Sequence, residues 1–452
     1  MMKLNRSWVL PAGAISMVAL GLAVIHLLNK DKAGYWSVVA ILALVGGAVS
    51  VVGSQRGAGA VLTVNEGSRA HRTWQTIGWA IFGFFVVATP YLLDSFRVTQ
   101  VNKGLYFAVA VLGVNLIIGY SGLISLGHGA FMGIGAFLAV ILVEDAGWPI
   151  WASLLVIIPV TFLAGVVVGI PALRIKGLYL ALVTLALSYA FPTVLKIEEG
   201  GIAQRTGGDL GRNISLDRQV LPGRLKGVLF LSNRNAPEQE QIYKYWIFVL
   251  VTAVCFLLVR NIVKSRAGRA VIAIKENQTG AAVSGVPLTT YKVITFGLSA
   301  VFAGVGGWMF AVLLNGADPN SFGAPLAITL LLALVLGGVY TLQGALVGGL
   351  LIVFLDDLRT RVTLTSVLGW RPSFFQIEKG SRLTQAVLGV ILILIAFFAP
   401  GGVVWIARRI RARVIQVIPA IPGADGAVSQ ATDGTVGTKA DTVVESEAVG
   451  SH

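Results

Sequence analysis

Long apolar runs, separated by short polar stretches, extend along most of the chain. Many of these runs approach or exceed the roughly 20 residues that a helix needs to cross about 30 Å of hydrocarbon. They do not alternate between apolar and polar positions, as the strands of a membrane barrel would. The pattern therefore predicts an all-α fold, a polytopic transmembrane helical bundle with about 10 to 12 membrane segments.

The hydropathy pattern places membrane segments at 8–28, 36–53, 74–93, 104–119, 121–143, 149–170, 177–196, 245–260, 291–314 and 383–399. A further apolar stretch, 325–355, would be about 46 Å long as one helix, which is more than a bilayer needs. We therefore predict a hairpin or a broken helix there, with the break near Gly337–Gly344. Glycine-rich membrane segments of this kind are expected to be broken or re-entrant.

Basic residues indicate which polar stretches face the cytoplasm. Arg56, Arg69 and Arg72 place the 54–73 loop inside, and the dense bases of 261–290 lie inside by the same alternation. The polar stretch 198–243 then lies outside, and both termini lie in the cytoplasm. Loop 356–382 is also placed outside, although it is itself rich in bases.

Composition agrees with a bilayer as the solvent, since 56% of the residues are hydrophobic, only 12% are charged and the mean hydropathy is +0.80. The net charge of +14 would suggest a nucleic-acid partner in a soluble protein. Here the bases lie beside predicted spans, where they act as orientation signals, so we expect no nucleic-acid binding. Cys255 is the only cysteine, so no intrachain disulfide can form.

The pattern divides the chain into three regions. Residues 1–100 carry additional N-terminal spans, and residues 101–400 form the main transmembrane region. Residues 401–452 comprise a basic juxtamembrane segment and then a polar stretch without helical period, which predicts a disordered cytoplasmic tail.

Ionisable groups are almost absent from the spans between 104 and 170, where His128 is the sole candidate for chemistry within the membrane. Small and polar residues crowd the same segment and the 337–349 stretch, which favours close helix packing or a lining for a translocation path. His128 itself could be a hydrogen-bonded packing residue or a substrate contact. The candidates for the path are Ser121, Gly122, Ser125, Gly127, His128, Gly129, Gly133, Gly337, Gly338 and Gly344.

The segment 264–290, inside the predicted cytoplasmic loop 261–290, is mostly polar and compatible with a helix up to about Ala282. Its apolar positions, at Ala270, Val271, Ile274, Ala281 and Ala282, are spaced to face a partner or the membrane surface. The pattern therefore predicts either a docking element for a partner or an amphipathic helix at the membrane surface.

Several runs resemble the permeases of branched-chain amino acid ABC importers, of which urea and short-amide permeases are relatives. The runs are VNLIIGYSGLISLGHGAFMGIGAFLAVIL at 114–142, RIKGLYLALVTLAL at 174–187, TGGDLG at 206–211, SRAGRAVIAIKENQTGAAVSGVPLTTYKVITFGLSAVFAGVGGWMFA at 265–311 and ALVLGGVYTLQGALVGGLL at 333–351. They lie in the family's order over roughly residues 104–400.

In such importers a cytoplasmic loop seats in a cleft of the ATPase subunit. The resemblance assigns this ATPase-coupling role to Arg266, Gly268, Arg269, Ala270, Ile274, Lys275, Glu276, Asn277, Ala281, Ala282 and Gly285. One position departs from the family, since Gly280 stands where the importer loop motif has Glu.

No G-x-x-x-x-G-K-[ST] motif occurs in the chain, so it is not expected to bind nucleotide or to act as an enzyme. The resemblance implies a second permease subunit, two cytoplasmic ATPase subunits that bind ATP-Mg, and an extracytoplasmic solute-binding protein. It implies a multi-pass location in the cell (inner) membrane, with no cofactor or metal on this chain. Leucine-type amino acids, urea and short amides remain open as substrates.

Two other classes of protein are alternatives. A secondary transporter or channel for a small polar solute would need no ATPase, but it usually depends on ionisable groups within the bilayer. A membrane-embedded enzyme would need paired acids or a metal cluster, and Asp356 with Asp357 is the nearest approach to one.

Overall fold

The computed structural model describes residues 62–65, 83, 86–91, 93–172, 178–198, 201–214, 236–361, 401–404 and 415–418. The chain forms two compact units, residues 1–84 with 411–452, and residues 85–410. In the first unit, β1 (Leu62–Asn65) pairs in parallel with β4 (Ile415–Ile418), so Leu62 lies opposite Ile415. The predicted spans 8–28, 36–53 and 383–399, most of 74–93, most of loop 356–382 and the tail beyond 418 lie outside the described residues.

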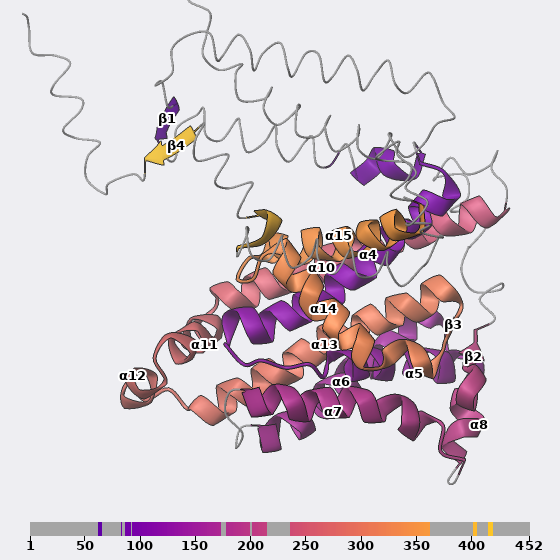
Figure 1. Cartoon of the computed structure of the whole chain (residues 1–452), viewed down its shortest axis with the longest axis horizontal. Coiled ribbons are helices and arrows are strands. Elements are labelled where there is room, and N and C mark those ends of the chain that lie inside the picture. Colours follow the sequence, from indigo (N-terminus) through magenta and orange to yellow (C-terminus); the bar gives the residue numbers. More distant parts are fainter. Residues whose placement is uncertain are drawn as a thin grey trace, which may run out of the picture. The chain divides into compact units, whose positions relative to one another are not determined.

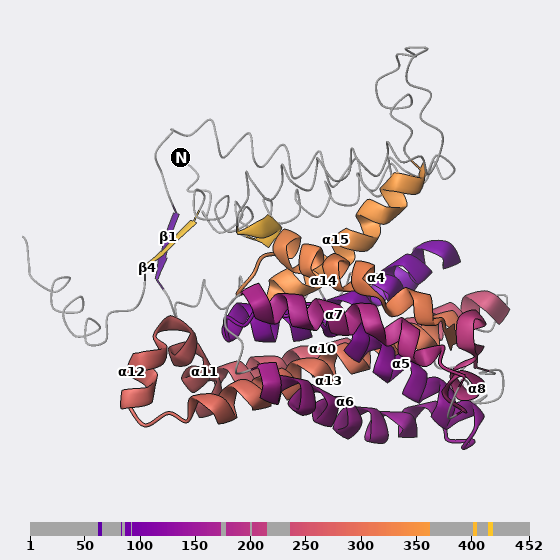
Figure 2. The same cartoon turned by 60° about the horizontal axis from the view of Figure 1, so that its bottom comes forward.

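The second unit is a bundle of long helices that lie side by side (Figures 1 and 2), which confirms the predicted polytopic helical fold. In the described part of the chain, four helices are long and apolar enough to cross a membrane, and four shorter apolar helices accompany them. The helices of the bundle are α4 (Ser95–Val114), α5 (His128–Glu144), α6 (Ile150–Ala172), α7 (Leu178–Leu195), α10 (Ala236–Lys264), α13 (Leu288–Leu314), α14 (Ala324–Gly337) and α15 (Leu342–Arg361).

Helices α4 and α13 form the centre of the bundle. The most apolar window is 78% buried in α4 and 83% buried in α13, against only 28% in α6 and in α10. Accordingly, Leu155 and Leu163 of α6 and Leu250 of α10 are largely exposed. Large apolar side chains on the outside of a membrane protein suit contact with lipid or with another subunit.

Glycine permits backbone-to-backbone contact between α13 and α5. A Cβ on Gly307 would lie 1.8 Å from the Met132 carbonyl oxygen, and one on Gly135 would lie 2.0 Å from that of Gly304. In lipid, where apolar burial gives little drive for helix association, small residues let helices gain dispersion contacts by close approach. The crossing of α5 and α13 therefore depends on the absence of side chains at these positions.

The helical path breaks at two places. The predicted break near Gly337–Gly344 is confirmed, because α14 ends at Gly337 and α15 begins at Leu342. Helix α4 continues into the π-helix η2 (Asn115–Tyr120), after which residues 121–127 form a drawn-out stretch without helix or strand, and α5 begins at His128. Figure 1 shows this extended stretch running from near α11 to the start of α5, so both glycine-rich regions do contain broken helices.

Short elements occupy the two opposite ends of the bundle (Figures 1 and 2). Helices α11 (Arg266–Glu276) and α12 (Gln278–Val283) form one end, which the charge pattern assigns to the cytoplasm. The other end carries α8 (Ile202–Thr206), η4 (Gly208–Leu210), β2 (Arg212–Asn213), β3 (Gly316–Ala317) and η6 (Pro319–Phe322), with β2 antiparallel to β3.

Two helices begin earlier than hydropathy indicates. Helix α4 starts at Ser95 rather than near 104, and α10 starts at Ala236, inside the polar stretch expected to be a loop. In α10 the polar first turns are accommodated because Lys244, which is fully buried, forms an ion pair of 2.6 Å with Glu240 one turn away. Because Lys244 is paired within its own helix, its charge can be buried, and its position does not show where the membrane segment begins.

Replacing Gly135 with Ala should lower the stability of the bundle. An alanine ordinarily stabilises a helix by about 0.5–1 kcal/mol relative to glycine, but here its methyl group would overlap the Gly304 carbonyl. The apparent unfolding temperature in detergent should therefore fall. Gly280→Ala on α12, where the nearest atoms belong to the Asn277 side chain at 3.3 Å, should leave it unchanged or raise it. Equal effects of the two substitutions would contradict this packing argument.

Candidate functional site

Two side-chain caps shape the predicted coupling segment. The Ser265 hydroxyl accepts a hydrogen bond from the Gly268 N–H and begins α11 directly after α10. Asn277 ends α11 and begins α12, and its side-chain oxygen accepts a hydrogen bond of 2.9 Å from the Gly280 N–H. Gly280, where the family motif has Glu, is thus held at the start of α12 through its backbone.

The apolar stripe of this segment faces the chain's own bundle. Val271, Ile274 and Ala281 are buried, although the sequence pattern suggested that they face a partner or the membrane surface. That orientation is corrected by the structure, because α11 packs on α10, α13 and η2.

The outward face of the segment carries charged residues and a small apolar tip. Arg266, Arg269 and Glu276 are exposed on α11, and Ala282 and Val283 are exposed on α12, with Val283 at 85%. The surface available to a partner is therefore mixed, with charges beside Val283. Hydropathy alone did not identify Val283, since its neighbours in sequence are polar or small.

The start of α11 is tightly joined to the end of α10. A Cβ on Gly268 would lie 2.3 Å from the carbonyl oxygens of both Ile262 and Val263. At the far end of the segment, Gly285 adopts a φ of +78°, a conformation that favours glycine, before α13 begins. The segment is thus fixed to α10 and turns into α13 through a glycine.

A cluster that we call the coupling junction, formed by Asn115, Lys275 and Tyr340, connects α11 to both helix breaks. The Lys275 ammonium lies 3.6 Å from the centre of the Tyr340 ring. The Asn115 amide donates to the Thr341 carbonyl at 2.9 Å, and its oxygen accepts from the Tyr340 N–H at 3.3 Å. The π-helix η2, the turn between α14 and α15, and the coupling segment therefore meet at one place.

The extended segment 121–127 is held by two hydroxyls of α7. Thr184 accepts a hydrogen bond of 2.8 Å from the Leu126 N–H, and Ser188 donates one of 2.7 Å to the Leu126 carbonyl. Unwound backbone at membrane depth is tolerated only where its polar groups find partners inside the protein. Thr184 and Ser188 are both fully buried and satisfy this requirement, although the sequence analysis did not select them.

The translocation-path candidates fall into two groups. Ser121, Gly122, Ser125, Gly127, His128, Gly129 and Gly133 lie along the extended segment and the start of α5, whereas Gly337, Gly338 and Gly344 lie at the turn between α14 and α15. The coupling junction brings the beginning of the first group close to the second, since a Cβ on Gly122 would lie 3.0 Å from the Lys275 side chain. His128 is buried, and among the described residues neither of its ring nitrogens has a hydrogen-bond partner, so the structure shows no hydrogen-bonded packing role for it.

Several of the glycines serve close packing. A Cβ on Gly337 would lie 1.9 Å from the Gly344 carbonyl oxygen, and one on Gly133 would lie 2.1 Å from the Phe191 ring. Gly338 has a φ of +118° and ends α14. The packing interpretation therefore accounts for Gly133, Gly337 and Gly344 in this structure.

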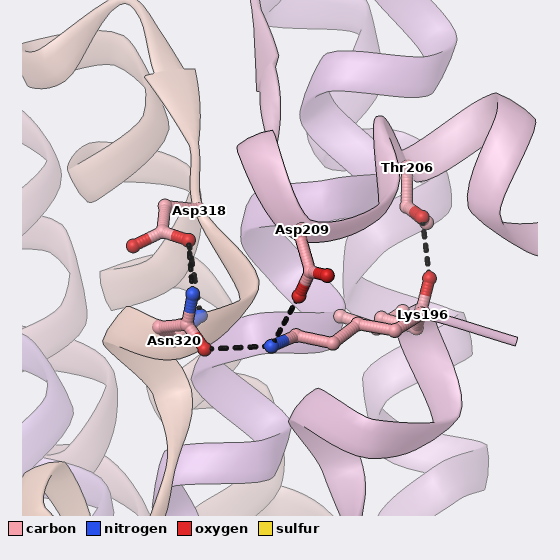
Figure 3. Close-up of polar contacts among 6 residues, drawn as sticks. Lys196, Thr206, Asp209, Asp318 and Asn320 are labelled. Atoms are coloured by element: carbon pink, nitrogen blue, oxygen red, sulfur yellow. Dashed lines mark hydrogen bonds and ion pairs between the residues drawn. The ribbon is translucent and has the colours of Figure 1, made fainter.

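Ion pairs fasten the opposite end of the bundle. Figure 3 shows the Lys196 ammonium between Asp209 of η4 and Asn320 of η6, at 2.6 Å and 2.9 Å. Asp318 in turn accepts a hydrogen bond from the Asn320 N–H at 3.1 Å. These contacts attach residues 201–214 to the connection between α13 and α14.

A second ion pair joins Arg212 of β2 to Asp145 at the end of α5. The hydrogen bond from the Arg212 guanidinium lowers the pKa of the Asp145 carboxyl below its ordinary value. At neutral pH the pair therefore helps to hold β2 against the bundle. Among the described residues, no three His, Cys, Asp or Glu side chains form a group that could hold a metal ion.

The fold and these contacts define a class, a polytopic helical membrane protein with two short helices, α11 and α12, at one end and broken helices inside. A family model described as "Branched-chain amino acid transport system / permease component" matches residues 97–396. The chain belongs to this permease family, which confirms the resemblance found in the sequence.

Curated relatives agree with the family. The chain is 27% identical over 282 residues to "High-affinity branched-chain amino acid transport system permease protein LivM" of Salmonella typhimurium. The aligned region covers 60% of this chain and 65% of the relative. It is 28% identical to LivM of Escherichia coli, with the same coverage, and 25% identical to BraD of Pseudomonas aeruginosa, with 68% of this chain and 94% of the relative covered. The chain thus spans just under two thirds of the length of the LivM relatives. No match to a solved structure was found.

Breaking the coupling junction should weaken the link between the coupling segment and the helix breaks. Asn115→Ala removes both hydrogen bonds to the turn at 340–341, each worth about 0.5–1.5 kcal/mol, and leaves the Tyr340 N–H and the Thr341 carbonyl without this partner. We expect residues 338–341 and 115–122 to become more mobile together, measured as faster amide hydrogen exchange in both. Thr329→Ala, which removes a hydroxyl of α14 bonded only within its own helix, is the control. Faster exchange confined to position 115 itself would argue against a shared junction.

Acidification should release β2 from the end of α5. The pKa of Asp145 is lowered in the folded state, so the ion pair stabilises the fold fully at a pH above the ordinary carboxyl pKa of about 4. This stabilisation is lost as the pH falls through the lowered pKa of the folded state. Asp145→Asn should therefore speed hydrogen exchange of residues 201–214 at pH 7 and reduce the effect of acid on that segment, where the Lys196–Asp209 pair remains. Glu198→Gln, a change at an exposed acid near the same end, should do neither. An Asp145→Asn protein with wild-type exchange at pH 7 would exclude this role for the pair.

Proposed function

We propose that this chain is the transmembrane permease subunit of an ATP-driven importer of branched-chain amino acids in the cell (inner) membrane. The observation that carries the proposal is the family match over residues 97–396, which contains nearly all of the bundle and the coupling segment between α10 and α13. The names of the LivM and BraD relatives support branched-chain amino acids as the substrate class. Neither a secondary transporter nor an enzyme is favoured by any contact in the described part of the chain.

The partners follow from this function. A second permease subunit would pack against an apolar face of the bundle, two cytoplasmic ATPase subunits would bind ATP-Mg, and a solute-binding protein would deliver the substrate outside. This chain would hold no cofactor of its own. The exposed apolar side chains of α6, α7 and α10 offer surfaces for the second permease or for lipid.

The geometry suggests how ATP hydrolysis could reach the translocation path. The exposed face of α11 and α12 would seat in the ATPase, and the Gly268 contact would pass its movement to α10. Lys275 and Asn115 would pass the same movement to the turn between α14 and α15 and to η2. Both helix breaks would then respond to one displacement, which is what alternation between outward-open and inward-open states requires.

The proposal predicts that the exposed charges of α11 couple ATP hydrolysis to uptake. With the assembled complex in vesicles, Arg269→Ala combined with Glu276→Ala should reduce ATP-driven leucine uptake by about tenfold or more, because both charges lie on the exposed face. The complex should still insert in the membrane, since both side chains are exposed and the contact recorded for them is one surface hydrogen bond, from Arg269 to the Lys264 carbonyl. Uptake and ATP hydrolysis are measured in the same preparation.

Arg260→Ala, which removes an exposed charge from α10 outside the coupling segment, is the matched control and should keep normal uptake. Normal coupled uptake by the double variant would place the ATPase contact elsewhere. Wild-type vesicles that concentrate leucine without any ATPase subunit would overturn the proposed function itself.

A further inference from the structure

Helix α5 begins inside the bundle rather than at its edge. After the extended segment, the residues from Gly127 to Ala130 are all buried, and α5 then continues for 17 residues to Glu144. The N–H groups of Ala130 and Phe131 both donate to the Gly127 carbonyl. Within the described residues, no acceptor is recorded for the N–H groups of His128 and Gly129. The start of a long helix, with its partial positive charge, is thus directed into the protein interior.

The His128 imidazole adds unpaired polar atoms at the same point. Its side chain is 1% exposed, and the ring meets Phe131 edge to face at 6.0 Å. In the described part of the chain, neither ring nitrogen has a hydrogen-bond partner. Buried polar groups are nearly always hydrogen-bonded, since leaving one unpaired costs stability. The neighbouring hydroxyls of Thr184 and Ser188 obey this rule. Stability of the fold therefore gives no reason for a histidine at this position.

Two backbone carbonyl groups lie close to Gly129 in the first turn of α5. A Cβ at Gly129 would be 3.1 Å from the Phe322 carbonyl oxygen and 3.2 Å from that of Gly323. The Gly323 carbonyl already accepts from Leu326, whereas no donor to the Phe322 carbonyl is recorded in the part of the chain that the structure describes. The Phe322 carbonyl of η6, for which no donor is recorded among the described residues, thus lies against Gly129 in the first turn of α5.

We propose that the first turn of α5 is the subsite that receives an α-amino acid zwitterion during passage. The imidazole of His128 and the N–H groups of His128 and Gly129 donate to its carboxylate, and the Phe322 carbonyl accepts from its ammonium group. A helix start buried at membrane depth is suited to an anionic group, and an unpaired carbonyl is suited to a cation. The inference rests on the proposed function and narrows its substrate to a zwitterion, which excludes urea and short amides.

Uptake by the assembled complex in vesicles, with its ATPases and binding protein, tests the role of His128. His128→Phe should lower kcat/KM for leucine by about 10- to 100-fold, the loss expected for a hydrogen bond to a charged group. His128→Gln, whose amide can still donate, should retain most of the uptake. Thr252→Val is the matched control, because it also removes a buried polar atom without a partner, but from α10. Unchanged leucine uptake by His128→Phe would overturn the inference.

A second measurement separates recognition of the carboxylate from packing. The permease complex without binding protein is heated in equal concentrations of leucine or leucinamide, which lacks the carboxylate. Leucine should raise the unfolding temperature of the wild type more than leucinamide does, and the two should be equal for His128→Phe. A His128→Phe complex that keeps the preference for leucine would assign His128 to packing and would overturn the inference.

Two outcomes distinguish this inference from the proposed function. Wild-type vesicles that take up no leucine on addition of ATP would refute the proposed function. Wild-type uptake together with normal uptake by His128→Phe would refute only the carboxylate subsite. If the phenylalanine variant does not assemble, Gly129→Ala replaces it, because its methyl group would lie against the Phe322 carbonyl. Assembled Gly129→Ala complexes should then lose leucine uptake.

Discussion

Unwound backbone inside an apolar bundle must find hydrogen-bond partners, and the structure depends on how this requirement is met. Residues 121–127 leave the helical path of α4, so their N–H and carbonyl groups lose the partners that a helix would supply. Thr184 and Ser188, one turn apart on α7, bind the N–H and the carbonyl of Leu126. This pair gives Leu126 its partners directly before α5 begins at His128, where unpaired backbone groups inside the bundle would be costly.

The same requirement explains the second break. The turn between α14 and α15 exposes backbone groups at residues 340 and 341, and Asn115 satisfies one donor and one acceptor there with a single amide. Because Asn115 lies in the π-helix η2, each break is bonded to the other. Lys275 then stacks on Tyr340 from the coupling segment. The two interruptions and helix α11 consequently form one connected structure, although Asn115 and Thr341 are 226 residues apart in the sequence.

Much of the bundle could be predicted from the sequence because hydropathy and length act locally. The helices between 95 and 361, the break between Gly337 and Leu342 and the helical coupling segment all follow from runs of apolar residues and from glycine positions. The early start of α10 could not be predicted in this way, since Glu240 and Lys244 appear polar to a hydropathy window. Their spacing of four residues did indicate that the two side chains could form an ion pair on one face of a helix.

Side-chain partners distant in sequence were beyond prediction for a physical reason. Thr184 lies 58 residues from Leu126, and only the folded arrangement of α7 beside the extended segment shows that its hydroxyl is an acceptor rather than a helix-surface group. The orientation of α11 was ambiguous in the same way, because an amphipathic stripe at Val271 and Ile274 fits a partner as well as it fits the chain's own bundle. His128 shows the converse case. Its residue type indicated a possible function, but only the folded structure shows that its ring nitrogens are buried without a hydrogen-bond partner among the described residues.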